Sequence, residues 1–232
     1  MKKILFSFGF MALSLYASQL DQDQFDLGKQ IYEETCISCH GVDGKAKTQM
    51  QLVVKPRDLT KTLLDQNQTY LTTKFGAHYW GAKADIMPSF DSVYNEEQLR
   101  AVTYYIVHHF HPDREKRINT LLKESQPIPK NKDKKMAKWG KKIYKRNCGW
   151  CHGSKGQGDG VATKNPINSI YPYDLTKTLL TKDQIFLYAK YGGHYFGAFK
   201  TDMPSWKKKY NDFKLHSVIK YIDEVLRKKN KD

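Results

Sequence analysis

Cys36-Ile37-Ser38-Cys39-His40 has the pattern C-x-x-C-H, and Cys148-Gly149-Trp150-Cys151-His152 repeats it. All 4 cysteines of the chain lie in these two pentapeptides. In this pattern the two thiols, one helical turn apart, can form thioethers with the vinyl groups of a haem, and the histidine can ligate the iron. The sequence therefore predicts two covalently bound haem c groups, held by Cys36, Cys39, His40, Cys148, Cys151 and His152.

Two C-x-x-C pairs can also bind zinc, or each can act as a redox-active dithiol. A zinc ribbon places its pairs roughly 15–20 residues apart, whereas an offset of 112 separates these two. A thioredoxin-like dithiol needs a βαβ context, and it leaves the histidine after each pair unexplained. Haem attachment is the favoured interpretation of both motifs.

The segments around the motifs are repeated as well. Before the motifs, Gly28-Lys29-Gln30-Ile31-Tyr32 matches Gly140-Lys141-Lys142-Ile143-Tyr144 at an offset of 112. After them the offset is 116, and it aligns residues 56–64 with 172–180 and residues 87–89 with 203–205. The chain is therefore a tandem duplication, with the second loop after the haem motif the longer one.

Each repeat is predicted to contain three short helices, because its apolar residues follow a helical period and no alternating strand pattern is present. The first helix is expected over 25–35 and 139–146, and the middle helix over 66–75 and 182–191. A glycine follows each middle helix and favours a positive φ there. Asn95 and Asn211 are good N-caps for the last helices. The expected fold class is all-α.

The N-terminal residues have the three parts of a secretory signal: Met1-Lys2-Lys3, the apolar run 4–15, and Ala17-Ser18. That run is shorter than the about 20 residues that a membrane span needs. We predict a cleaved signal peptide over 1–18, export to the periplasm and no transmembrane span. The other predicted parts are an N-terminal domain (19–113), a linker (114–135) and a C-terminal domain (136–232).

The charge is distributed unevenly between the two halves. Residues 18–125 contain 13 Lys and Arg against 15 Asp and Glu, whereas residues 126–232 contain 24 against 9. In an exported haem protein such an excess favours an acidic docking face on another redox protein over nucleic acid, because opposite potentials accelerate encounter. Solvation of the surface is the simpler explanation for any single lysine run.

Each repeat resembles a class I cytochrome c, and two repeats behind a signal peptide resemble the two-haem periplasmic cytochromes c. The resemblance implies two tandem domains, each a few helices wrapped around one covalently bound haem. It makes His40 and His152 the proximal ligands and Met87 and Met203 the distal ligands. It also gives Pro56 and Pro172 the role of the loop proline whose carbonyl accepts the Nδ1 proton of the proximal histidine.

Two histidines compete with the methionines for the distal position. His78 and His194 also recur at the offset of 116, inside glycine and aromatic surroundings. A thioether favours ferrous iron, so His/Met ligation raises the reduction potential, whereas bis-His ligation would lower it relative to His/Met. Otherwise these histidines are expected to hydrogen-bond a propionate or to pack where domains or haems approach.

The resemblance implies an electron carrier without catalytic residues, which exchanges single electrons with quinol-oxidising complexes, reductases or a terminal oxidase. The alternative is an electron-transfer subunit of a two-haem oxidoreductase, or such an enzyme itself, peroxidase-like or acting on sulfur compounds. His108-His109-x-His111 is absent from the second repeat. It is interpreted as a solvated helix end, with a metal site as the alternative.

Overall fold

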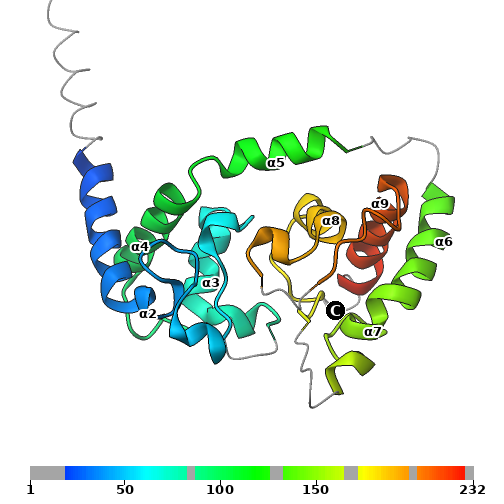
Figure 1. Cartoon of the computed structure of the whole chain (residues 1–232), viewed down its shortest axis with the longest axis horizontal. Coiled ribbons are helices and arrows are strands. Elements are labelled where there is room, and N and C mark those ends of the chain that lie inside the picture. The colour runs from blue at the N-terminus through cyan, green and yellow to red at the C-terminus, as the bar shows by residue number, and fades with distance from the viewer. Residues whose placement is uncertain (1–18, 83–86, 126–132, 165–171, 199–202, 228–232) are drawn as a thin grey trace, which may run out of the picture.

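The computed structural model describes residues 19–82, 87–125, 133–164, 172–198 and 203–227. The predicted signal peptide, 1–18, lies outside them. Every regular element within these ranges is helical, which confirms the all-α prediction (Figure 1). None of the described helices is long and apolar enough to cross a membrane.

The two halves of the chain form two domains that lie side by side, with helix α5 running across one edge of both (Figure 1). The N-terminal domain contains a helix over 19–31, η1 (Tyr32–Cys36), α2 (Ile37–His40), η2 (Gln49–Leu52), η3 (Leu59–Lys61), α3 (Gln66–Tyr79) and α4 (Glu96–Phe110). The C-terminal domain contains α6 (Asp133–Ile143), η4 (Tyr144–Cys148), α7 (Gly149–His152), η5 (Val161–Lys164), α8 (Lys182–Tyr191), η6 (His194–Phe196), α9 (Asp212–Tyr221) and η7 (Ile222–Arg227). Helix α5 (Arg114–Lys123) lies between them in the chain.

Local sequence signals account for most helix ends. Asn95 caps α4, and its side chain accepts from the Gln98 N–H while the Gln98 side chain accepts from the Asn95 N–H. Gly76 and Gly192 have φ of 77° and 86°, as expected where the middle helices stop. The first helices begin earlier than predicted, because residues 19–24 and 133–138 are already helical.

Glycine lets the first and last helices of each domain cross at close range. A Cβ on Gly28 would lie 2.0 Å from the Ala101 carbonyl oxygen, and a Cβ on Gly140 would lie 2.0 Å from the Ser217 carbonyl oxygen. Next to the first crossing, Tyr32 is buried against aromatic rings of α4. Both crossings therefore depend on the absence of a side chain.

Helix α5 falls in the segment predicted as a linker, and it contacts both domains. Arg114 Nε donates to the Leu63 carbonyl oxygen at 2.7 Å. Arg117 donates to the carbonyl oxygens of residues 60, 61 and 62. Ile118 and Leu121, on the same face of the helix, are buried in the core cluster of the C-terminal domain. This part of the linker therefore fixes the two domains against each other.

The interface between the domains consists of contacts that occur in pairs. Asp58 N–H donates to the Gly197 carbonyl oxygen at 3.0 Å, and Asp174 N–H donates to the Gly81 carbonyl oxygen at 2.7 Å. Residues 58 and 174 are repeat counterparts, and so are residues 81 and 197. Each contact is thus made twice with the roles exchanged, as in the isologous interface of a two-fold symmetric dimer.

Candidate functional site

Both C-x-x-C-H motifs follow a π-helical turn. In η1 and η4 the chain widens, so that the N–H of Ile37 donates to the Tyr32 carbonyl oxygen and the N–H of Gly149 to the Tyr144 carbonyl oxygen. Such turns are rare and frequently occur at functional sites. Cys36 and Cys148 are the last residues of these π-helical turns, and the following single helical turns, α2 and α7, hold one further free thiol and one imidazole each.

Burial makes the first cysteine of each motif a poor thiolate. It raises the pKa of Cys36 to about 12, with a further contribution from the charge of Cys39. Burial likewise raises the pKa of Cys148 to about 12, with a contribution from Cys151. Redox-active dithiols instead have a lowered pKa, because the thiolate is the reactive form. The raised pKa of the first thiol in each motif therefore disfavours the dithiol interpretation.

Each motif histidine is held by one backbone carbonyl. His40 Nδ1–H donates to the Arg57 carbonyl oxygen at 3.0 Å, and His152 Nδ1–H donates to the Tyr173 carbonyl oxygen at 2.9 Å. A carbonyl only accepts, so the proton lies on Nδ1 and the lone pair of Nε2 is available to bind a metal. Burial also lowers the pKa of both histidines, which favours the neutral, ligating form.

The assignment of the accepting carbonyls to Pro56 and Pro172 was wrong by one residue. The acceptors are the next residues, Arg57 and Tyr173. The side chains of these two residues also meet across the domain interface, with the Arg57 guanidinium 5.3 Å from the centre of the Tyr173 ring. The two proximal loops are therefore neighbours.

The predicted distal methionines occupy matching positions in the two domains. The Met87 carbonyl oxygen accepts from Ala77 N–H at 3.0 Å, and the Met203 carbonyl oxygen accepts from Gly193 N–H at 2.7 Å. Both bonds tie the methionine segment to the end of the middle helix. Met203 also packs against the core cluster of its domain. Ligation of iron by these methionines stays a prediction.

His78 and His194 also match each other in detail. Their Nδ1 atoms are hydrogen-bonded to the carbonyl oxygens of Ala82 and Ala198 at 3.1 and 3.2 Å. Both residues are exposed. An Nδ1 atom bound to a carbonyl leaves Nε2 as the coordinating atom, so these histidines stay the predicted rivals of the methionines.

The residues at the motifs fit a covalently attached haem. Two thiols and one imidazole with a free Nε2 lie within two helical turns in each domain. In the N-terminal domain the buried hydroxyl of Thr73 has no hydrogen-bond partner among the described residues. The carbonyl of Thr73 accepts from Phe90 N–H, close to the Met87 segment. This hydroxyl can therefore serve a polar group of the haem.

The histidine cluster at the end of α4 does not form a metal site in the described part of the chain, where no group of three potential ligands is found. His108 and His109 are exposed, as expected for a solvated helix end. His111 departs from that expectation, because it is 4% exposed and both of its ring nitrogens lack a partner among the described residues.

The sequence reasoning missed the domain interface, although the repeat contained a signal for it. Gln68 and Gln184 are identical residues at the offset of 116, and their side chains bond to each other. In an interface between two like domains, a residue can meet its own counterpart, and the same polar residue is then expected at that position of both repeats.

Comparison with known families agrees with this geometry. The family model described as cytochrome c matches residues 25–110, and the model described as cytochrome C oxidase, cbb3-type, subunit III matches residues 135–222. The chain is a two-domain c-type cytochrome. Cytochrome c domains bind haem c covalently and transfer electrons, so these are the coarse cofactor and function of this cytochrome.

One solved structure similar to this cytochrome is titled the Kuenenia stuttgartiensis reducing HAO-like protein complex Kustc0457/Kustc0458. The two share 23% sequence identity over 85% of this chain and 94% of that chain, with a TM-score of 0.45. At this level the likeness carries no argument about function. No curated protein matches the chain.

Proposed function

We propose that this cytochrome carries single electrons on two haem c groups between redox proteins of the periplasm. The observation that carries the proposal is the pair of proximal sites: in each domain a neutral imidazole with a fixed Nδ1–H lies beside two free thiols. The pattern over residues 1–18 supports export, which the covalent attachment of haem in the resembling family also requires.

Met87 and Met203 are proposed as the sixth ligands. Their repeated position at the end of the middle helix supports this role, because the same backbone bond holds both segments. An iron ligated on both faces exchanges electrons but leaves no position for a substrate. Closed coordination is therefore what separates a carrier from an enzyme.

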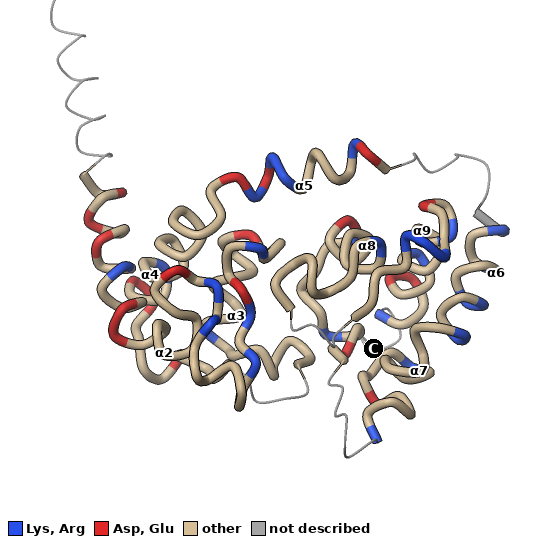
Figure 2. The backbone as a smooth tube through the Cα atoms, in the orientation of Figure 1, with Lys and Arg blue, Asp and Glu red and all other residues tan. Residues whose placement is uncertain are grey.

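The proposed docking face for acidic partners lies on α6 and η4. Lys and Arg gather along α6 (Figure 2). The exposed basic residues of this strip are Lys135, Lys138, Lys141, Lys142, Lys145 and Arg146. Within the described ranges, no acidic residue forms an ion pair with any of them. We refer to these six residues as the basic strip.

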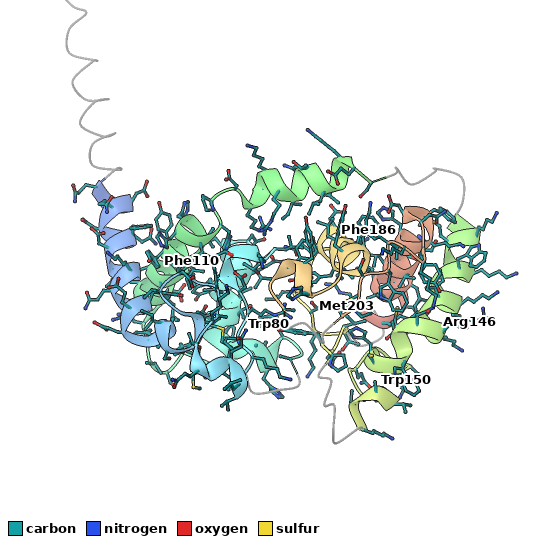
Figure 3. All side chains as sticks on the ribbon, viewed as in Figure 1. Trp80, Phe110, Arg146, Trp150, Phe186 and Met203 are labelled. Carbon is teal, nitrogen blue, oxygen red and sulfur yellow. The ribbon has the colours of Figure 1, made fainter. Side chains whose placement is uncertain are left out.

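Trp150 gives the basic strip an apolar neighbour. Its side chain is 60% exposed although it lies inside the haem motif, and the labelled Arg146 and Trp150 follow each other along the η4–α7 segment (Figure 3). Exposed tryptophan and arginine are typical anchors of protein interfaces. Charge steers the encounter and the aromatic ring supplies contact area close to the haem.

The proposed partners are proteins that supply or consume single electrons: quinol-oxidising complexes, reductases or a terminal oxidase. Nucleic acid is not among them. The alternative function is that of a subunit of an oxidoreductase, or of a two-haem enzyme that is peroxidase-like or acts on sulfur compounds. An enzyme needs at least one iron with an open or displaceable sixth position.

The absorption spectrum of the oxidised protein tests the proposal. We expect a far-red Met-to-iron charge-transfer band with the intensity of two haems, which is halved in Met87→Ala and in Met203→Ala. His78→Ala and His194→Ala are the matched controls, and they should leave the band unchanged. Carbon monoxide binding to the reduced wild-type protein would contradict closed coordination and favour the enzyme.

A further inference from the structure

One peptide group joins the proximal site of the N-terminal domain to the C-terminal domain. Its carbonyl oxygen, on Arg57, accepts from His40 Nδ1–H at 3.0 Å. Its N–H, on Asp58, donates to the Gly197 carbonyl oxygen at 3.0 Å. Because a peptide group is planar and rigid, the bond to Gly197 also fixes the direction of the carbonyl that faces His40.

The second repeat makes the reciprocal connection. The Tyr173 carbonyl oxygen accepts from His152 Nδ1–H at 2.9 Å. The N–H of the same peptide group, on Asp174, donates to the Gly81 carbonyl oxygen at 2.7 Å. Each proximal imidazole is thus held by a peptide group that the opposite domain holds in turn.

The accepting glycines belong to the loops that carry the proposed distal ligands. Next to Gly197, Ala198 N–H donates to the Gly193 carbonyl oxygen at 3.0 Å, and Gly193 N–H donates to the Met203 carbonyl oxygen at 2.7 Å. In the N-terminal domain, Ala82 N–H donates to Ala77 and Ala77 N–H to Met87, both at 3.0 Å. Hydrogen bonds and covalent links therefore run from the proximal side of each site to the distal loop of the other.

This approach of the two backbones is possible only because both acceptors are glycine. A Cβ on Gly197, at φ +84°, would lie 2.3 Å from the Asp58 carbonyl oxygen. A Cβ on Gly81, at φ +95°, would lie 2.6 Å from the Asp174 carbonyl oxygen. Either collision involves backbone atoms, which cannot rotate away as the end of a side chain can.

We propose that Gly81 and Gly197 are positioning residues for the proximal histidine of the opposite domain, and that they couple the reduction potentials of the two haem sites. The inference rests on the proposed function, because it requires one haem in each domain. It extends that function by making the two sites interdependent.

Polarisation of the shared peptide group gives the coupling its direction. An amide whose N–H donates a hydrogen bond becomes a better acceptor at its carbonyl. A stronger bond from His Nδ1–H to that carbonyl makes the imidazole a more basic ligand, which favours ferric iron. When the N–H of Asp58 or Asp174 loses its bond to the glycine of the other domain, the reduction potential of the haem beside that aspartate should therefore rise.

Gly197→Ala in the full-length holoprotein tests this crossed effect. The Asp58 amide proton should exchange with solvent about tenfold faster or more, as expected when one hydrogen bond is lost. A redox titration with domain-assigned NMR signals should show a higher potential for the haem bound by His40. Gly81→Ala should produce the mirror result, at the Asp174 amide and at the haem bound by His152.

Gly156→Ala is the matched control. Gly156 lies in the same domain as Gly197 and has a similar φ of +80°, but the three atoms nearest to its Cβ would all be side-chain atoms, Leu226 Cδ1 at 3.0 Å, Tyr144 Oη at 3.5 Å and Leu226 Cβ at 3.6 Å. This variant carries the same backbone strain without a collision with the other domain. We expect unchanged exchange at Asp58 and an unchanged potential at the haem bound by His40.

If Gly197→Ala does not yield holoprotein, Asp58→Pro and Asp58→Ala form a second pair. Asp58 has φ of −67°, which proline can adopt. Both variants lack the Asp58 carboxylate, but only Asp58→Pro also lacks the N–H that donates to Gly197. Only Asp58→Pro should therefore accelerate Nδ1 proton exchange at His40. Equal effects of the pair, or equal effects of Gly197→Ala and Gly156→Ala, would overturn the inference. A wild-type spectrum without two His/Met haems would instead overturn the proposed function.

Discussion

The side-chain amides of Gln68 and Gln184 hydrogen-bond to each other in both directions across the domain interface, with N···O distances of 2.9 and 2.8 Å. Each amide nitrogen also donates to a carbonyl of the opposite domain, at Leu179 and Leu63. Each amide oxygen also accepts the N-cap N–H of its own helix, at Asp65 and Thr181. Both amides are buried with all their hydrogen-bonding groups satisfied.

Replacing one of these glutamines should lower the free energy of unfolding by more than the loss of its own hydrogen bonds, because the amide of the other glutamine stays buried with one bond unmade. We expect Gln68→Ala or Gln184→Ala to lower the free energy of unfolding by about 1–3 kcal/mol each. The double variant should lose clearly less than the sum of the two. Urea denaturation measures all three values. Gln98→Ala is the control, because that glutamine bonds across the start of its own helix; additive losses would contradict the paired arrangement.

The helix crossings should tolerate no side chain at all. Gly28→Ala places a Cβ against the Ala101 carbonyl and Gly140→Ala against the Ser217 carbonyl, so each should lower the free energy of unfolding by about 3 kcal/mol or more. Thermal denaturation provides the measurement. Gly149→Ala is the control, since its Cβ finds its nearest atom at 3.5 Å. A stable Gly28→Ala protein would show that the helices can move apart.

Acid should destabilise this cytochrome through His111. Burial lowers the pKa of His111 to about 4, and the nearby charges of Arg114, Arg117 and His108 add to this shift. The usual pKa is 6.5, so the unfolded chain binds the proton first as the pH falls. Stability is therefore complete above pH 6.5 and is lost progressively down to about pH 4, by roughly 3 kcal/mol in total.

His111→Leu removes both the titrating ring and its unpartnered nitrogens. Relative to the wild type, its unfolding free energy should gain roughly 3 kcal/mol between pH 7 and pH 4. His108→Leu, on the exposed end of the same helix, should keep the wild-type pH dependence. Parallel pH profiles for wild type and His111→Leu would show that another group is responsible for the acid sensitivity.

The basic strip should control electron exchange with charged reagents. In a variant with Lys138→Glu, Lys141→Glu and Lys145→Glu, oxidation of the haem bound by His152 by the anion ferricyanide should slow about tenfold at low salt. Oxidation by a cationic cobalt complex should accelerate. Stopped-flow absorption measures both rates, and the differences should fade as the Debye length falls below about 8 Å above 0.15 M salt.

The matched control replaces three exposed lysines of the N-terminal half by glutamate, at Lys29, Lys47 and Lys116, and so reverses their charge. It changes the total charge by the same amount but leaves the basic strip intact. Equal slowing in the two triple variants would mean that net charge, and not a docking face, determines the rate.

The sequence by itself determined the parts of this protein that short-range chemistry encodes. The two C-x-x-C-H motifs and the cap of α4 each depend on residues that are close in the chain, so their spacing was enough to predict them. The duplication needed only a comparison of the two halves of the sequence. The first helices were predicted too short, since residues 19–24 and 133–138 are already helical.

Only the tertiary structure decided how the two sites are joined. Whether Pro56 or Arg57 presents its carbonyl to His40 depends on how the loop is oriented, and the bond from Asp58 N–H to Gly197 fixes that orientation. That bond connects residues far apart in the chain, and it exists because two similar domains fit together around an approximate two-fold axis. Such a fit depends on the shapes of two folded surfaces, which local patterns of residues do not specify.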